Sequence, residues 1–83
     1  MKEQNVTVSH AADHEFQLAT LVVQTASSFQ SRIQIRIGNK NVNAKSIMGM
    51  TYLALMDGDI VTISVNGPDE DAALDDLTNL LVG

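Results

Sequence analysis

The sequence predicts an α+β fold, in which a sheet is covered on one face by helices. Two kinds of apolar spacing support this: apolar and polar residues alternate in four segments, as in strands, and recur every three or four positions in three others, as in helices. In chain order these segments read strand–helix–strand–strand–helix–strand–helix. Because only the helices are long enough to act as crossovers, an antiparallel or mixed sheet is expected. No repeat or linker divides residues 1–83, which we expect to form a single domain.

The first half of the chain supplies three of the predicted strands and one helix. Val6 and Val8 alternate with polar residues and predict a short first strand. Residues 16–29 are predicted as a helix, with an apolar stripe of Leu18, Leu21, Val22, Thr25 and Phe29. Residues 33–37 alternate cleanly and predict a strand with one buried face. A turn at residues 38–39 then leads into a brief return strand at 41–43.

The second half adds two helices around a further strand. A short helix is predicted over residues 47–55, and Gly58 separates it from a strand at 60–65. Pro68 suits the first position of the last helix, after a Gly67 cap, because the N–H that proline lacks is not needed there. The core-facing stripe of this helix consists of Leu74, Leu77 and Leu81.

Composition excludes several classes of function. Ten acids against five bases give a net charge of −5, without the clustered Lys and Arg that contacts to nucleic-acid phosphates need. Cysteine is absent, which excludes disulfides and thiolate metal sites. No apolar run reaches membrane-spanning length, and the first five residues lack the apolar stretch of a signal peptide. We therefore expect a cytoplasmic protein with no nucleic-acid or membrane partner.

The most specific segment is residues 41–49, which read Asn-Val-Asn-Ala-Lys-Ser-Ile-Met-Gly. It places Ser46 at the expected N-cap of the short helix, where its hydroxyl can accept a hydrogen bond from a free backbone N–H. A phosphate added to this hydroxyl would lie at the positive end of the helix dipole. Ser46 is therefore either a simple cap or a regulatory site, and we favour the regulatory site.

This segment closely resembles the regulatory-serine motif of the HPr family, the phosphocarriers of the bacterial sugar phosphotransferase system. Residues 19–27, which read Ala-Thr-Leu-Val-Val-Gln-Thr-Ala-Ser, resemble the first helix of the same family. The match runs without gaps from about residue 7 to residue 81. It implies an HPr-like open-faced β-sandwich, with a four-stranded antiparallel sheet covered on one face by three helices.

The catalytic motif of the family departs from its pattern in this chain. Where the family reads His-Ala-Arg-Pro-Ala-Thr, residues 15–20 read Glu-Phe-Gln-Leu-Ala-Thr. Glu15 occupies the position of the phosphorylatable histidine, and Gln17 that of an arginine that helps to hold the phosphoryl group. Imidazole suits phosphoryl transfer because it is nucleophilic near neutral pH. We therefore predict no catalytic residue, no enzyme activity and the loss of carrier chemistry.

Two alternatives at this motif remain open. His14 lies one residue before the expected position and is either a displaced phosphoryl acceptor or, as we favour, a solvent-exposed loop histidine. Glu15 either imitates a phosphorylated histidine or, as we favour, is an ordinary acid at a helix start. His10 and His14 are too few ligands for a metal site, and we expect neither a metal nor a cofactor.

The resemblance also implies partners. In the family a bifunctional HPr kinase/phosphorylase phosphorylates the serine, and the phosphorylated form acts as corepressor of a catabolite-control transcription factor. Ile47 and Met48 follow Ser46, and exposed apolar side chains of this kind often mark partner surfaces, although core packing is an equal alternative. Phe16, Gln17 and Thr20, at the start of the first helix, are expected to extend that surface.

Within the family, the combination of a lost histidine and a retained serine resembles Crh, the catabolite-repression HPr. Our leading hypothesis is a non-catalytic regulatory protein phosphorylated at Ser46, as a monomer or dimer. A second hypothesis is a phosphocarrier that uses His14 and receives its phosphoryl group from enzyme I. A third is an interaction module with the HPr fold but without phosphorylation.

Overall fold

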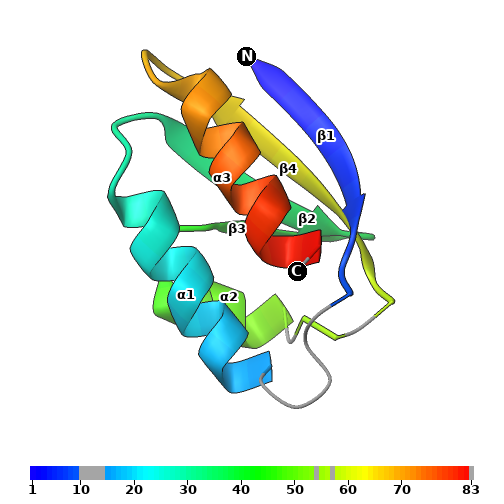
Figure 1. Ribbon diagram of the computed structural model, residues 1–83. Coiled ribbons are helices and arrows are strands. Elements are labelled where there is room, and N and C mark those ends of the chain that lie inside the picture. The colour runs from blue at the N-terminus through cyan, green and yellow to red at the C-terminus, as the bar shows by residue number, and fades with distance from the viewer. Residues whose placement is uncertain (10–14, 54, 57, 83) are drawn as a thin grey trace.

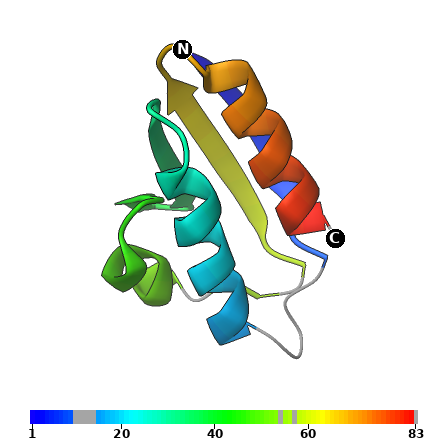
Figure 2. The same ribbon diagram turned by 60° about the vertical axis from the view of Figure 1, so that its left-hand side comes forward.

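The computed structural model describes residues 1–9, 15–53, 55–56 and 58–82, with the backbone alone at 15–17. Four strands form one sheet in the order β1-β4-β2-β3, and every neighbouring pair is antiparallel. Among these residues the elements are β1 Lys2–Thr7, α1 Glu15–Ser27, β2 Arg32–Ile37, β3 Lys40–Asn43, α2 Ile47–Leu53, β4 Ile60–Asn66 and α3 Glu70–Val82. The helices lie on one side of the sheet (Figures 1 and 2). This arrangement confirms the predicted fold class and its strand–helix order.

The core lies between the sheet and the helices. In β2 and β4 the residues that face the helices are fully buried except for the partly buried Ile37 at the end of β2; the fully buried ones are Ile33, Ile35, Val61, Ile63 and Val65. The helices bury Leu18, Val22 and Ala26 of α1, Met50 and Leu53 of α2, and Ala73, Leu74, Leu77 and Leu81 of α3 against them. The alternate residues of β2 and β4 face away from the helices, so the opposite face of the sheet stays open and polar.

Strand β1 is longer at its N-terminal end than the sequence pattern predicts. Of its side chains only that of Val6 is buried, yet the strand pairs with β4 along its whole length, from Lys2↔Val65 to Thr7↔Ile60. Val8 lies just beyond the strand and is fully buried, and its N–H donates to the carbonyl oxygen of Asp59 at 2.8 Å. Backbone pairing, rather than side-chain burial, therefore forms most of β1.

Helices α1 and α2 both end before the residues at which the sequence pattern predicts their ends. Helix α1 ends at Ser27, because the next two N–H groups, those of Ser28 and Phe29, bond three residues back in a tightened final turn. Phe29 still packs against the core from outside the helix. Leu21, which we placed on the apolar stripe, is 41% exposed, whereas Ala19 and Ala26 are buried. Helix α2 spans Ile47–Leu53, and Leu55, the predicted last residue of this helix, lies outside it.

The predicted start of the last helix is wrong. Pro68 is not its first residue, because α3 begins at Glu70 and its first helical bond runs from the N–H of Ala73 to the carbonyl oxygen of Asp69 at 3.0 Å. Asp69 is therefore the N-cap residue by position, and Pro68 precedes it. The side chain of Asp69 does not cap α3, since it bonds across the molecule to the segment before β2.

That bonding defines a contact that we call the Ser31–Asp69 junction, formed by Gln30, Ser31, Gly67 and Asp69. The carboxylate of Asp69 accepts hydrogen bonds from the N–H groups of Gln30 and Ser31, both at 2.9 Å, and from the hydroxyl of Ser31. Ser31 is fully buried, and its Cα and Oγ lie 2.6 Å from where a side chain on Gly67 would begin. The junction thus joins the entry into β2 to the entry into α3, and only glycine leaves room for it.

Gly67→Ala is expected to destabilise the protein more than Gly38→Ala. Both glycines have a positive φ, 156° at Gly67 and 56° at Gly38, but no atom lies within 4 Å of an added Cβ at Gly38. The cost at Gly38 is therefore conformational, about 1 kcal/mol. At Gly67 the added methyl also meets the backbone of Ser31, and we expect a loss of at least about 2 kcal/mol. Urea unfolding of both variants measures the difference, and equal losses would contradict the close approach.

The junction also predicts a pH dependence of stability. The hydroxyl of Ser31, and then the backbone N–H groups of Gln30 and Ser31, hold the pKa of Asp69 below its usual value. Because the folded pKa is depressed, the stabilisation is fully present above the unfolded pKa of about 3.9 and is lost as the pH falls through the folded value.

Asp69→Asn should therefore destabilise the protein at neutral pH, and its difference from the wild type should shrink below about pH 4. Thermal unfolding at several pH values measures this difference. Asp76→Asn, on the exposed side of α3, is the matched control and should show no such trend. A difference between wild type and Asp69→Asn that stays constant down to low pH would exclude a carboxylate bond at the junction.

Candidate functional site

Ser46 occupies the N-cap of α2, as the sequence predicts. Its Oγ accepts a hydrogen bond from the N–H of Gly49 at 3.2 Å, and its carbonyl oxygen accepts the first helical bond, from Met50, at 3.0 Å. The turn that leads from β3 into α2 is fixed by Asn43, whose Oδ1 accepts the N–H of Lys45 at 2.9 Å. The side chain of Ser46 is half-buried, so part of it faces solvent.

Beside Ser46 lies an exposed apolar surface, which we call the α2 surface and define as Ile47, Met48, Thr51 and Tyr52. The exposed fractions are 43% for Ile47, 81% for Met48 and 62% for Tyr52. The four side chains line a shallow hollow of about 330 Å³. Met50 and Leu53 of the same helix are buried, so the core uses the other side of α2. Ile47 and Met48 are therefore surface residues, and the core-packing alternative is wrong for them.

Tyr52 was not among the predicted site residues. The ammonium nitrogen of Lys40 lies 5.0 Å from the centre of its ring, close enough for a cation–π contact. The sequence signal that could have found Tyr52 is the apolar spacing of Met50 and Leu53. These two residues are buried on one side of α2, and Tyr52 lies on the other side. Lys40 of β3 therefore brings one cation to this surface.

The residues predicted at the start of the first helix are only partly placed. Glu15, Phe16 and Gln17 form the first turn of α1, but their part in a partner surface stays a prediction because the structure describes only their backbone. Thr20 is half-buried on α1, the helix that packs against α2. Glu15 is the first residue of α1, a position at which the helix dipole stabilises an acidic side chain. His14, the displaced acceptor, lies outside the described residues.

The described residues form neither a metal-binding cluster nor a membrane-spanning helix. Among those residues no three His, Asp or Glu side chains lie close enough together to bind a metal ion. His10 lies outside them, as does His14. No helix in the described ranges has the length and apolar character needed to cross a bilayer.

Comparison with known proteins places this geometry in a family. Residues 2–82 match the model of the PTS HPr component phosphorylation site. The phosphocarrier protein HPr of Xylella fastidiosa is 35% identical over 80 residues, which cover 96% of this chain and 90% of that protein.

Solved structures agree with this match. HPr from Bacillus anthracis superposes with a TM-score of 0.91 at 38% identity, over 96% of this chain and 95% of that one. Crh, the catabolite-repression protein of Bacillus subtilis, superposes with a TM-score of 0.72 at 37% identity, over 92% of this chain and 83% of that one. Similarity alone therefore does not separate HPr from Crh.

HPr is a phosphocarrier and not itself an enzyme, in agreement with the expectation that this chain has no enzyme activity. The family model spans nearly the whole sequence, and the sheet, the helices and the capping serine all follow the expected arrangement. The chain belongs to the HPr family of the phosphotransferase system.

Proposed function

We propose that this chain is a regulatory member of the HPr family, which signals through phosphorylation of Ser46 and has lost carrier chemistry. The observation that carries the proposal is the position of Ser46, whose hydroxyl caps α2 directly beside the exposed α2 surface. A phosphate there adds about two negative charges and three acceptor oxygens to the edge of an apolar surface. A partner that offers arginine or lysine beside an apolar groove would then distinguish the two forms.

The residue at position 15 supports the loss of carrier chemistry. Glu15 takes the place where the family has its phosphoryl-accepting histidine, and a carboxylate is a poor replacement for a neutral imidazole nucleophile. With Gln17, the cation that would balance the transferred phosphoryl group is also absent from the first turn of α1. This combination supports a Crh-like role over that of a general carrier.

The partners that follow are an HPr kinase/phosphorylase, which would modify Ser46, and a catabolite-control transcription factor, which would bind the phosphorylated form. Ile47, Met48 and Tyr52 would supply the apolar contacts of that binding. Phe16, Gln17 and Thr20 are proposed to extend the same surface from α1. We propose a cytoplasmic protein that acts as a monomer or a dimer; the related Crh was crystallised as a domain-swapped dimer.

A second function is favoured by a specific observation, the 35% identity to a phosphocarrier HPr together with the match to the phosphorylation-site model. In that case His14 would accept the phosphoryl group from enzyme I, one residue before the usual position, and His14→Ala would abolish transfer. Phosphoryl transfer depends strongly on the geometry of the accepting group, and His14 is one residue away from the position that the family uses. We therefore rank it second.

Phosphorylation of Ser46 is tested with ATP and an HPr kinase/phosphorylase, with intact mass as the readout. We expect the wild type to gain one phosphoryl group and Ser46→Asn to gain none. Asparagine is the informative replacement because it caps helices about as well as serine, whereas Ser46→Ala should cost about 1 kcal/mol of stability. Thr51→Ala, which removes the hydroxyl that bonds to the carbonyl oxygen of Ile47, is the matched control and should still be phosphorylated.

The interaction module without phosphorylation makes the opposite prediction. If the wild type gains no phosphoryl group while an ordinary HPr in the same reaction does, Ser46 is a cap alone. If Ser46→Asn is modified as readily as the wild type, another hydroxyl is the target and the proposal fails.

A further inference from the structure

The charges of this chain are segregated along its sequence. No Asp or Glu occurs between residues 16 and 56, although the whole chain has ten. Four of its five bases lie in that stretch, namely Arg32, Arg36, Lys40 and Lys45. In the fold this stretch forms nearly all of α1 and the whole of β2, β3 and α2, and its four bases lie on β2, on β3 and in the turn before α2. A protein with a net charge of −5 therefore has a region around β2 and β3 that carries bases and no acids.

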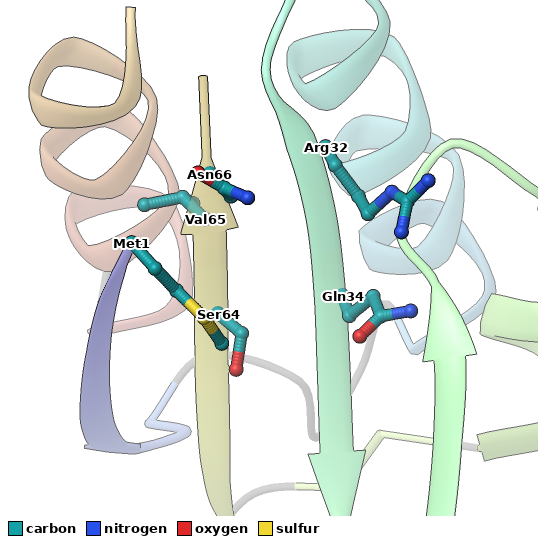
Figure 3. A pocket seen from close by; sticks show the side chains of 6 residues that line it. All are labelled: Met1, Arg32, Gln34, Ser64, Val65 and Asn66. Carbon is teal, nitrogen blue, oxygen red and sulfur yellow. The ribbon is translucent and has the colours of Figure 1, made fainter.

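Arg32 lies in that region, at the start of β2 and on the open face of the sheet. It pairs in register with Asn66 of β4, and Gln34 pairs with Ser64, so four polar side chains occupy adjacent positions on the same face. Together with Met1 they surround a hollow of about 120 Å³ (Figure 3). In the same view the guanidinium of Arg32 points away from β4, toward the chain that follows β3.

A second and wider hollow, of about 590 Å³, adjoins the first, since Arg32 and Asn66 line both. Gln30, Asn43 and Lys45 contribute further polar side chains to its lining. The two hollows thus bring together two cations and several amide groups. No carboxylate belongs to the lining of either hollow among the described residues.

The carboxylates nearest to these hollows already have partners among the described residues, but the side chain of Arg32 has none. The carboxylate of Asp69 is held by the backbone of Gln30 and Ser31, and that of Glu3 accepts the hydroxyl of Ser64 at 3.1 Å. Within the part of the chain that the structure describes, the side chain of Arg32 makes no hydrogen bond or ion pair. Its guanidinium is therefore free to bind a ligand that enters the hollows.

We propose that Arg32, with Lys45, Asn43 and Asn66, forms a binding site for an oxyanion group, a phosphate or a carboxylate, of a small polar ligand. Guanidinium binds both groups through two parallel N–H···O bonds, which gives it the leading role. Lys45 adds a second positive charge, although one of its three N–H bonds goes to the carbonyl oxygen of Phe29 at 2.8 Å. The amides of Asn43 and Asn66 can donate to the remaining oxygens or bind hydroxyl groups of the ligand.

The site uses residues outside the proposed partner surface, and its test is independent of Ser46 phosphorylation. Inorganic phosphate and acetate are titrated in separate arms into isotopically labelled protein, at an ionic strength held constant with chloride. Chemical shifts of the Arg32 Nε–H and of the side-chain amides of Asn43 and Asn66 are the readout. Saturable shifts of these groups are expected in at least one arm, and that arm identifies the oxyanion.

Two arginine variants make the test specific. Arg32→Gln should weaken binding about tenfold or more, since it removes a charged, doubly bonded donor. Arg36→Gln removes the same charge from the same face of the same strand but leaves both hollows intact, and it should change the affinity less than about twofold. If both variants weakened anion binding equally, the binding would come from general charge attraction and the proposed site would be overturned. No saturable shift in either arm, or binding unaffected by Arg32→Gln, would also overturn the site.

Discussion

The burial of only one face of the sheet is the constraint on which the rest of this structure depends. Strands β2 and β4 alternate apolar and polar residues, so their large aliphatic side chains lie on the side of the helices. The exception is Ile60, the first residue of β4, which is exposed. The three described helices must therefore share that side, and each has an outer surface that the core does not need (Figure 2). On α2 this outer surface carries Ile47, Met48 and Tyr52, and the uncovered side of the sheet carries Arg32.

The parts of the fold that depend on local pattern were predictable. Residues 33–37 and 60–65 alternate cleanly because one face of each strand is buried, and both strands were placed to within a residue. The start of α3 was not predictable, because the carboxylate of Asp69 bonds to Gln30 and Ser31, almost forty residues away in the sequence. The extent of β1 was missed for a similar reason, since its exposed residues are held by backbone pairing with β4.

The same distinction applies to the functional residues. Ser46 could be recognised as a cap because capping is local, with the bonded N–H only three residues away. The exposure of Met48 and Tyr52 depends on how α2 packs, and the sequence left it open. The hollows at Arg32 could not be predicted from the sequence, because they depend on the register of β2 against β4 and on the path of the chain after β3. Nothing in the spacing of Arg32, Lys45 and Asn66 along the sequence indicates that they meet.

We propose that this member of the HPr family keeps regulation through Ser46 and has lost phosphoryl transfer. The most direct measurement is the intact mass of the protein after incubation with phosphoenolpyruvate and enzyme I, with an ordinary HPr in the same reaction as the internal standard. We expect the standard to gain one phosphoryl group and the mass of this chain to stay unchanged. A phosphoryl group gained by this chain, and absent in His14→Ala, would show a working carrier and contradict the loss of phosphoryl transfer.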